Sequence, residues 1–251
     1  MEQEAVFSKE LLKEGKSCSG RKEAMLKLDA SWDFFTQEAF KVLRTNLQFC
    51  GQDVRVVALT SSHENEGKTT VALHLAKSLA ELNKKVLVID ADMRKSVIAG
   101  RNANVKQVVG LSELLTRQAE LHDCIYTTQY SGLSIIFAGK YPPNPVELLS
   151  SPLFDNLLAD MRKQYDYVIL DTPPLGLVID AAVVAPKIDG TMLVLDNGNV
   201  RYRQAQEVVS QLEKSGGKVL GVVRNHVTRS SGSYYGGRYY GKNSYYGKEY
   251  R

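Results

Sequence analysis

One short stretch of this chain constrains its fold more than any other. The β-branched run VRVVALT at 54–60 leads into the polar loop SSHENEGKTT at 61–70, and an apolar-striped helical pattern follows directly. Residues 62–69 read S-x-x-x-x-G-K-T, the phosphate-binding loop pattern with serine in place of its first glycine. Loop N–H groups and the positive end of a helix dipole together form an anion site. The stretch therefore predicts a nucleotide-binding fold.

The rest of the chain repeats the alternation of strand and helix. Continuous apolar runs predict strands at 85–92, 133–139, 165–174, 191–197 and 218–227, and helical periodicity predicts helices at 69–82, 111–121, 151–163 and 201–214. Strands that are apolar along their whole length are typical of a parallel sheet covered on both faces. We expect an α/β fold of the P-loop NTPase type, with a doubly wound, mostly parallel sheet and helices on both faces.

Three parts of different composition are expected along the chain. Residues 1–30 are polar and weakly patterned, which indicates an N-terminal arm. Residues 31–227 form the nucleotide-binding domain, and apolar residues at helical spacing within 32–49 predict a helix lying outside the main fold. Residues 228–251 are rich in Gly, Ser, Tyr and basic residues without periodicity, which predicts a disordered tail.

Bulk composition restricts the cellular setting. The net charge is +4, concentrated at the two basic ends of the chain, which is too weak to indicate a nucleic-acid partner. The three cysteines, Cys18, Cys50 and Cys124, show no metal or disulfide spacing and fit a reducing compartment. We find neither a signal peptide nor an apolar run long enough to span a bilayer, and expect a cytoplasmic protein.

The loop and the helix after it supply the predicted nucleotide contacts. Gly67 permits close approach of the backbone to phosphate, Lys68 can reach the β- and γ-phosphates, and the Thr69 hydroxyl can bind Mg²⁺. Asn225 ends the last strand, where an adenine contact and a structural turn are equally compatible with the sequence. The predicted nucleotide-binding set is Ser62, Glu64, Asn65, Glu66, Gly67, Lys68, Thr69, Thr70 and Asn225.

Carboxylates follow two other predicted strands. VLVIDADMR at 86–94 carries Asp90 and Asp92, and YVILDTPP at 167–174 carries Asp171. The carboxyl ends of parallel strands are where α/β sheets bind ligands, so these carboxylates are candidate Mg²⁺ ligands and bases. Taken alone, Asp171 is also explained as a strand-end cap or turn residue. We expect Thr69, Asp92 and Asp171 to organise the metal, and the sequence leaves open which of Asp90 and Asp92 is the base.

The tail concentrates tyrosine. Seven tyrosines fall among the last 18 residues, separated mainly by glycine and basic residues. Composition alone favours a low-complexity polar-aromatic segment, whereas the alternative is a set of phenol substrates for an active site. The residues are Tyr234, Tyr235, Tyr239, Tyr240, Tyr245, Tyr246 and Tyr250.

Taken together, these segments resemble the bacterial tyrosine kinases, P-loop enzymes that regulate capsule and exopolysaccharide synthesis. The family's Walker A, A′ and B motifs match SHENEGKT, VLVIDADMR and YVILDT, and GKYPPNPVELLSS at 139–151 is similar to its PPNP-x-ELL segment. EAFKVLRTNLQF at 38–49 is similar to its E-x-x-R-x-x-R oligomerisation helix through Glu38, Lys41 and Arg44, with lysine where arginine is usual. Without the resemblance, these three charges are most simply a solvated helix face.

The resemblance implies a protein-tyrosine kinase that uses ATP and Mg²⁺. Lys68, Asp90, Asp92 and Asp171 are then the catalytic residues, with Asp90 as the candidate acceptor of the phenol proton. The seven tail tyrosines are then autophosphorylation sites, used in trans within a ring-forming homo-oligomer. An alternative is a nucleotide-dependent ATPase of the partitioning or division-site class, but these proteins carry a signature lysine near the loop start and lack a tyrosine tail.

The resemblance also implies partners. A separate transmembrane activator would recruit the chain to the inner face of the cell membrane. A cognate tyrosine phosphatase would reverse the modification, and polysaccharide-synthesis proteins would be external substrates.

Overall fold

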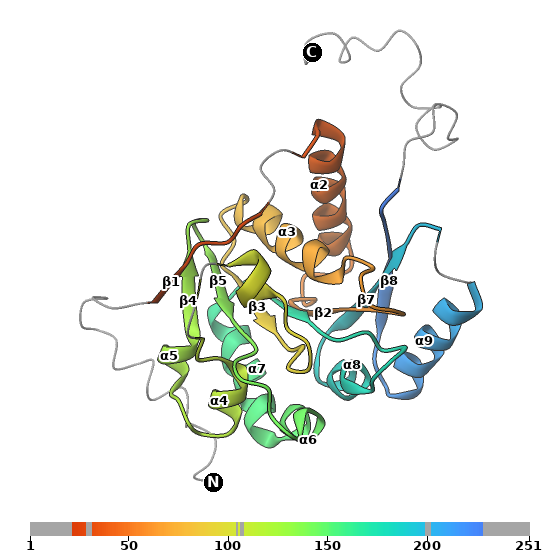
Figure 1. The fold of residues 1–251 in the computed structure, drawn as a ribbon. Coiled ribbons are helices and arrows are strands. Elements are labelled where there is room, and N and C mark those ends of the chain that lie inside the picture. The colour runs from red at the N-terminus through yellow and green to blue at the C-terminus, as the bar shows by residue number, and fades with distance from the viewer. Residues whose placement is uncertain (1–21, 29–31, 104, 106–107, 199–201, 228–251) are drawn as a thin grey trace, which may run out of the picture.

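The computed structural model describes residues 22–28, 32–103, 105, 108–198 and 202–227. Eight strands form one sheet in the order β1-β4-β5-β3-β6-β2-β7-β8, in which β4 and β5 are antiparallel and the other neighbouring pairs are parallel (Figure 1). The strands are β1 (Lys22–Ala24), β2 (Val56–Ser61), β3 (Val86–Asp90), β4 (Ile125–Thr128), β5 (Leu133–Ile136), β6 (Tyr167–Asp171), β7 (Gly190–Asp196) and β8 (Val219–Asn225). The predicted α/β fold with a mostly parallel sheet is confirmed.

Helices cover both faces of this sheet (Figure 1). Helices α2 (Phe34–Phe49) and α3 (Lys68–Ala80) lie on one face. The other face is covered by α4 (Leu111–Leu115), α6 (Pro145–Ser150), α7 (Pro152–Gln164), α8 (Asp180–Val184) and α9 (Tyr202–Lys214). The shorter elements are α5 (Leu121–Cys124), a π-helical turn at Ile98–Asn102 and a 3₁₀ turn at Ala185–Lys187.

The burial of the central strand β2 explains why the strands of this sheet are continuous apolar runs in the sequence. All six of its residues are buried. Val57 and Leu59 pack into the core shared with α2 and α3, whereas Val56 and Ala58 pack into the core on the opposite face. Because successive side chains of a strand point to opposite faces, a strand buried on both sides carries apolar residues at successive positions. At the end of β2 the buried Thr60 and Ser61 are polar, and their hydroxyls donate to backbone carbonyls.

The structure differs from the sequence-based expectations at several places. The helix expected at 111–121 is divided into α4 and α5, with Arg117 between them in the left-handed region at φ 57°. The expected polar arm contributes the edge strand β1, which pairs with β4. Helix α2 does not lie outside the main fold, because it packs on α3 and buries Leu47 in the core. Short strands and helix docking depend on long-range contacts that a local pattern does not contain.

Other expectations concern residues that the structure does not describe. The tail at 228–251 and its seven tyrosines lie outside the described residues, as does Cys18. The domain boundaries at 30 and 227 therefore stay predictions. In the described part of the chain, no helix is long and apolar enough to cross a bilayer.

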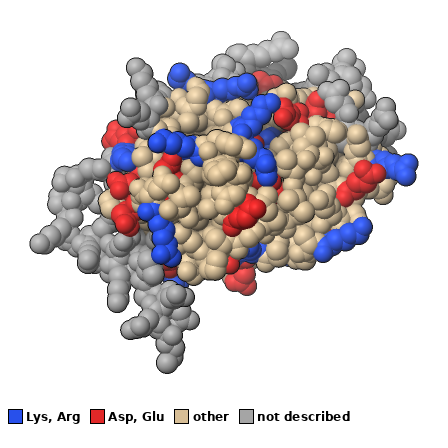
Figure 2. All heavy atoms as spheres, turned by 60° about the horizontal axis from the view of Figure 1, so that its bottom comes forward, with Lys and Arg blue, Asp and Glu red and all other residues tan. Residues whose placement is uncertain are grey.

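One surface of the molecule can be followed in Figure 2. Lysine and arginine side chains alternate there with aspartate and glutamate around areas of uncharged residues. Interspersed charges of both signs are typical of an ordinary solvent-facing surface.

The thiol of Cys124 is expected to resist alkylation in the folded protein. Cys124 is fully buried, and burial is the main cause that raises the pKa of its thiol to about 12. Because the thiolate is the reactive form, iodoacetamide at pH 8 should label Cys124 only after denaturation. Mass spectrometry of native and urea-treated protein measures this, with the half-buried Cys50 as the internal comparison. Equal labelling of Cys124 and Cys50 in the native protein would contradict the expected burial.

Candidate functional site

A cavity of about 490 Å³ opens at the carboxyl ends of the central strands. Its wall combines the loop after β2 with segments that follow β3, β6 and β8. Most of the predicted site residues lie on this wall: Glu64, Asn65, Gly67, Lys68, Thr69, Thr70, Asp92 and Asp171. The fold thus brings together three motifs that are far apart in the sequence.

The start of α3 leaves an open anion site. Gly67 is in the left-handed region at φ 86°, and α3 begins after it without a side-chain cap hydrogen bond. The first N–H groups of a helix then remain available to a ligand, and the helix dipole favours negative charge there. A Cβ on Gly67 would lie 2.0 Å from Nδ2 of Asn225, so a larger residue would collide as well as strain the backbone.

Three of the predicted contact residues support the loop from behind. Glu66 is 3% exposed, and its Oε2 accepts hydrogen bonds from the backbone N–H groups of Ser62, at 2.7 Å, and His63, at 2.9 Å. Asn225 Nδ2 donates to the backbone carbonyl of Glu66 at 3.0 Å. Ser62, Glu66 and Asn225 therefore shape the loop and are not among the residues that line the cavity. Their direct contact with nucleotide stays a prediction.

The charged centre of the cavity lies at the start of α3. Lys68 Nζ is 3.8 Å from Asp92 Oδ2, and Thr69 Oγ1 donates to Asp171 Oδ2 at 2.6 Å. The second oxygen of Asp171, Oδ1, is buried and has no hydrogen-bond partner. Burial raises the pKa of Asp171 to about 6, although Lys68 and Thr69 act in the opposite direction. A cation at this position would satisfy the unpaired oxygen and offset the cost of burying the carboxylate.

The oxygen atoms at this centre fit Mg²⁺. A hydroxyl from Thr69 and carboxylates from Asp92 and Asp171 are the hard oxygen ligands that this ion prefers. Among the described residues no group of three or more His, Cys, Asp or Glu side chains is arranged to hold a metal alone. In nucleotide sites Mg²⁺ is usually bound through one or two carboxylates together with substrate phosphates.

The two carboxylates at the end of β3 and just after it occupy different places. Asp92 lies on the cavity wall, whereas Asp90 is fully buried behind it. Asp90 accepts hydrogen bonds from the Ser96 hydroxyl and from the backbone N–H of Asp92. Burial, followed by the negative charge of Asp171, raises the pKa of Asp90 well above its usual value. Asp92 is therefore the one of the two carboxylates that lines the cavity, whereas Asp90 does not line it and is bonded to Ser96.

The sequence did not identify several residues on this wall. Arg94 Nε donates to the fully buried Asp180 at 2.9 Å, which ties the segment after β3 to the start of α8. Lys95 Nζ pairs with Glu64 at 2.6 Å, and Arg101 and His226 also line the cavity. In the sequence, the only indication that Arg94 belongs to the site is its position in the Walker A′ segment. His226 gives no such indication, because the histidines of the chain show no metal-ligand spacing.

The predicted oligomerisation residues of α2 make contacts within the chain. Arg44 Nη1 donates to the carbonyl of Ser78, at 2.7 Å, and to its hydroxyl, at 3.1 Å, on α3. Lys41 pairs with Glu38 at 2.6 Å on the same helix. Arg44 thus links α2 to the helix that carries the phosphate loop, and the role of this helix in oligomerisation stays a prediction.

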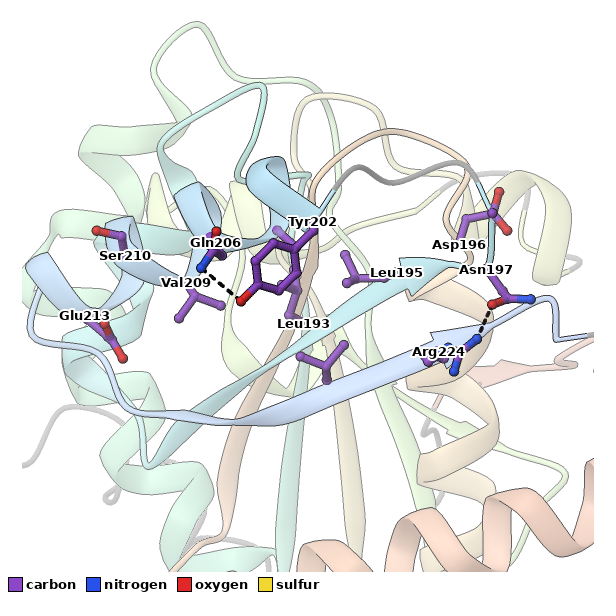
Figure 3. Close-up of a pocket in the computed structure, with 13 residues that line it drawn as sticks. Leu193, Leu195, Asp196, Asn197, Tyr202, Gln206, Val209, Ser210, Glu213 and Arg224 are labelled. Atoms are coloured by element: carbon purple, nitrogen blue, oxygen red, sulfur yellow. Dashed lines mark hydrogen bonds between the residues drawn. The ribbon is translucent and has the colours of Figure 1, made fainter. Parts of the chain in front are cut away.

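A second cavity of about 630 Å³ lies between α9 and the strands β7 and β8 (Figure 3). Apolar residues such as Leu193, Leu195 and Val222 contribute to its lining, and Asp196 and Asn197 stand at one end. This cavity lacks the loop, the lysine and the carboxylate cluster. We therefore assign nucleotide binding to the cavity beside the loop.

Comparison with known proteins agrees with this geometry. A family model described as an AAA domain matches residues 54–196. The tyrosine-protein kinase CpsD of Streptococcus agalactiae is 40% identical over 207 residues, which cover 82% of this chain and 90% of that protein.

Solved structures give the same result. The kinase domain of the Escherichia coli tyrosine kinase ETK matches with a TM-score of 0.71 and 33% identity, covering 79% of this chain and 80% of that one. The septum site-determining protein MinD of Pyrococcus horikoshii, solved in complex with Mg-ADP, matches with a TM-score of 0.59 and 26% identity, covering 70% and 72%.

Proposed function

The chain belongs to the family of bacterial tyrosine kinases and is itself a protein-tyrosine kinase, and we propose that it phosphorylates its own C-terminal tyrosine cluster in trans. One observation supports this most strongly. An uncapped helix start, a lysine, a threonine and two carboxylates converge on one cavity, which is the set needed to hold a nucleoside triphosphate. The output would be the regulation of capsular or extracellular polysaccharide synthesis.

Different residues of the cavity have different roles in phosphoryl transfer. Lys68 and the N–H groups at the start of α3 bind and orient the β- and γ-phosphates of ATP and stabilise their negative charge. Thr69 and Asp171, with Asp92 beside them, would hold Mg²⁺, and the bound ion would supply positive charge that offsets the negative charge of the phosphates. Such a reaction depends mainly on positioning and charge stabilisation.

The acceptor tyrosine must lose its proton during transfer. A phenol has a pKa of about 10, so a neighbouring carboxylate is needed near neutral pH. The phenol oxygen forms a bond to the γ-phosphorus, the bond to the β–γ bridging oxygen breaks, and ADP departs with that electron pair. We propose that Asp92, which lines the cavity, accepts this proton, and Asp90, which is buried and bonded to Ser96, stays the alternative.

Transfer in trans is supported by the dimensions of the chain. The 24 residues at 228–251 would span about 25–30 Å as a flexible coil, which is comparable to the radius of one subunit. Helix α2 exposes Phe34, Phe35, Val42 and Phe49, which are between 51% and 82% exposed. Large apolar side chains on one exposed helix suit contact with a second copy. We propose a ring-shaped homo-oligomer built through this helix.

A mixing experiment tests transfer between subunits. One full-length chain carries Lys68→Met and keeps the tail, and a second chain keeps Lys68 but ends after Val227. With Mg-ATP, neither chain alone is expected to gain phosphotyrosine, whereas the mixture should gain it on the Lys68→Met chain. Mass spectrometry of the separated chains identifies which one carries the phosphate.

The outcomes of mixing are distinct. A mixture without phosphotyrosine, while the wild-type chain labels itself, would exclude transfer between subunits. A wild-type chain that hydrolyses ATP but never forms phosphotyrosine on any tail tyrosine would exclude autophosphorylation and favour an assembly ATPase.

Further partners follow from family membership. We propose that a separate transmembrane protein activates this chain and holds it at the inner face of the cell membrane. A tyrosine phosphatase would return the tail to its basic state, since each phosphate adds about −1.5 to −2 charges. Crowded negative tails would loosen a ring through repulsion, which couples phosphorylation to assembly.

A further inference from the structure

The strand order assigns the two ends of a bound nucleotide to two sides of the phosphate loop. The loop follows β2, and the sheet runs β3-β6-β2-β7-β8 through this region. Asp92 follows β3, and Asp171 ends β6. The centre that would bind the terminal phosphate therefore lies on the β3 and β6 side of the loop. We expect the nucleoside end to extend toward the opposite side of the loop, where β7 and β8 end.

His226 is the residue that stands on this other side. It follows β8 directly and lines the cavity beside the loop. A Cβ placed on Gly67 would lie 3.7 Å from Nε2 of His226, so this ring nitrogen is turned toward the loop. No other residue after β7 or β8, within the described part of the chain, lines this cavity.

The orientation of the imidazole is fixed from the opposite edge of the ring. His226 Nδ1 is 2.9 Å from Oδ1 of Asp196, whose carboxylate accepts a hydrogen bond from the Nδ1–H. Asp196 ends β7, and Asn197 next to it accepts a hydrogen bond from Arg224 of β8 (Figure 3). The bond at Nδ1 therefore leaves Nε2 as the ring nitrogen that a ligand would meet.

The backbone supports this placement. Asn197 N–H donates to the carbonyl of Asn225 at 2.9 Å, and Asn225 in turn holds the loop through Glu66. His226 itself adopts a left-handed conformation at φ 54°, which is uncommon for a residue other than glycine.

We propose that His226, oriented by Asp196, is a nucleotide-positioning residue that contacts the nucleoside half of bound ATP. This inference rests on the proposed function of the cavity and adds to it. Nε2 supplies one hydrogen-bonding atom, and the ring supplies a flat face for a sugar or base. Asn225 holds the loop, and His226 makes the contact that the sequence had suggested for its neighbour.

Calorimetric titration of the full-length chain with two probes tests the proposal. Mg-ADP carries a nucleoside, whereas Mg-tripolyphosphate carries phosphates alone. We expect His226→Ala to weaken Mg-ADP binding roughly tenfold and to leave tripolyphosphate binding within about twofold of wild type.

A second variant separates a contact from a structural role. In His226→Asn the side-chain amide can restore the bond to Asp196, but it has no atom at the Nε2 position. We expect this variant to bind Mg-ADP as weakly as His226→Ala. His122→Ala is the matched control, because His122 is also exposed and lies 3.6 Å from a neighbouring aspartate, away from this cavity.

Each alternative result would contradict a specific part of the proposal. Full recovery of Mg-ADP affinity in His226→Asn would assign His226 a structural role, and unchanged affinity in His226→Ala would remove it from the site. An equal loss with tripolyphosphate would place the contact on the phosphates. A wild-type chain that binds tripolyphosphate and not Mg-ADP would refute the nucleoside contact, and one that binds neither would refute the proposed function itself.

Discussion

Replacement of Lys68 by methionine is expected to lower the rate of phosphotyrosine formation by roughly 10³-fold or more. The Lys68 ammonium lies 3.8 Å from Asp92 at the start of α3, where the terminal phosphate of ATP would lie. Methionine has a similar length but no charge, so the negative charge on the transferring phosphoryl group loses its nearest cation. Immunoblotting for phosphotyrosine after incubation with Mg-ATP measures the effect.

A lysine on the same helix provides the control. Lys77 lies further along α3, pairs with Glu81 and contacts the Tyr130 ring, and it is not among the residues that line the cavity. Lys77→Met should therefore retain phosphorylation close to that of wild type. Persistent labelling of the Lys68→Met chain by itself would refute the assignment of the nucleotide site.

Replacement of Arg94 by alanine is expected to lower the free energy of unfolding by about 3 kcal/mol. Arg94 holds the carboxylate of Asp180, which is fully buried, through contacts of 2.9 and 3.1 Å. Removal of one partner leaves a buried charge without compensation, which costs more than the pair itself contributes. Urea or thermal unfolding without nucleotide measures the loss, and a domain of this size would melt about 6–12 °C lower.

A double-mutant cycle shows whether the unpaired carboxylate causes the loss. Asp180→Ala in the Arg94→Ala background should recover a large part of the stability, because the stranded charge is gone. Arg101→Ala is the control on the same cavity wall, and it should change stability by less than about 0.5 kcal/mol. The prediction is contradicted if Asp180→Ala lowers the free energy of unfolding of the Arg94→Ala chain by as much as it lowers that of the wild-type chain. The two residues would then act independently.

The phosphate loop and the sheet could be predicted because their signals are local. The buried strands are apolar along their length, and the S-x-x-x-x-G-K-T spacing lies within one turn between a strand and a helix. The backbone conformation of Gly67 and the helix that begins after it depend on neighbours in the sequence. The length and the end of each long strand were accordingly predicted to within a few residues.

The roles of individual side chains could not be predicted in the same way. Asp90 and Asp92 are two residues apart on a strand end, yet one lies behind the cavity wall and the other on it. Asn225 and His226 are adjacent, but one holds the loop and the other faces the cavity. These differences arise from contacts outside each local pattern, such as those of Asn225 with Glu66 and of His226 with Asp196.

By itself, the sequence determined the class of fold, the phosphate loop, the three strand-end carboxylates and the family of the chain. These features depend on spacing and on apolar pattern, which a linear sequence records completely. Only the tertiary structure decided that α2 docks on α3, that Arg94 binds Asp180, and that Asp196 orients His226. Each of these is a contact between distant segments, whose energy depends on burial and geometry that exist only after the sheet has assembled.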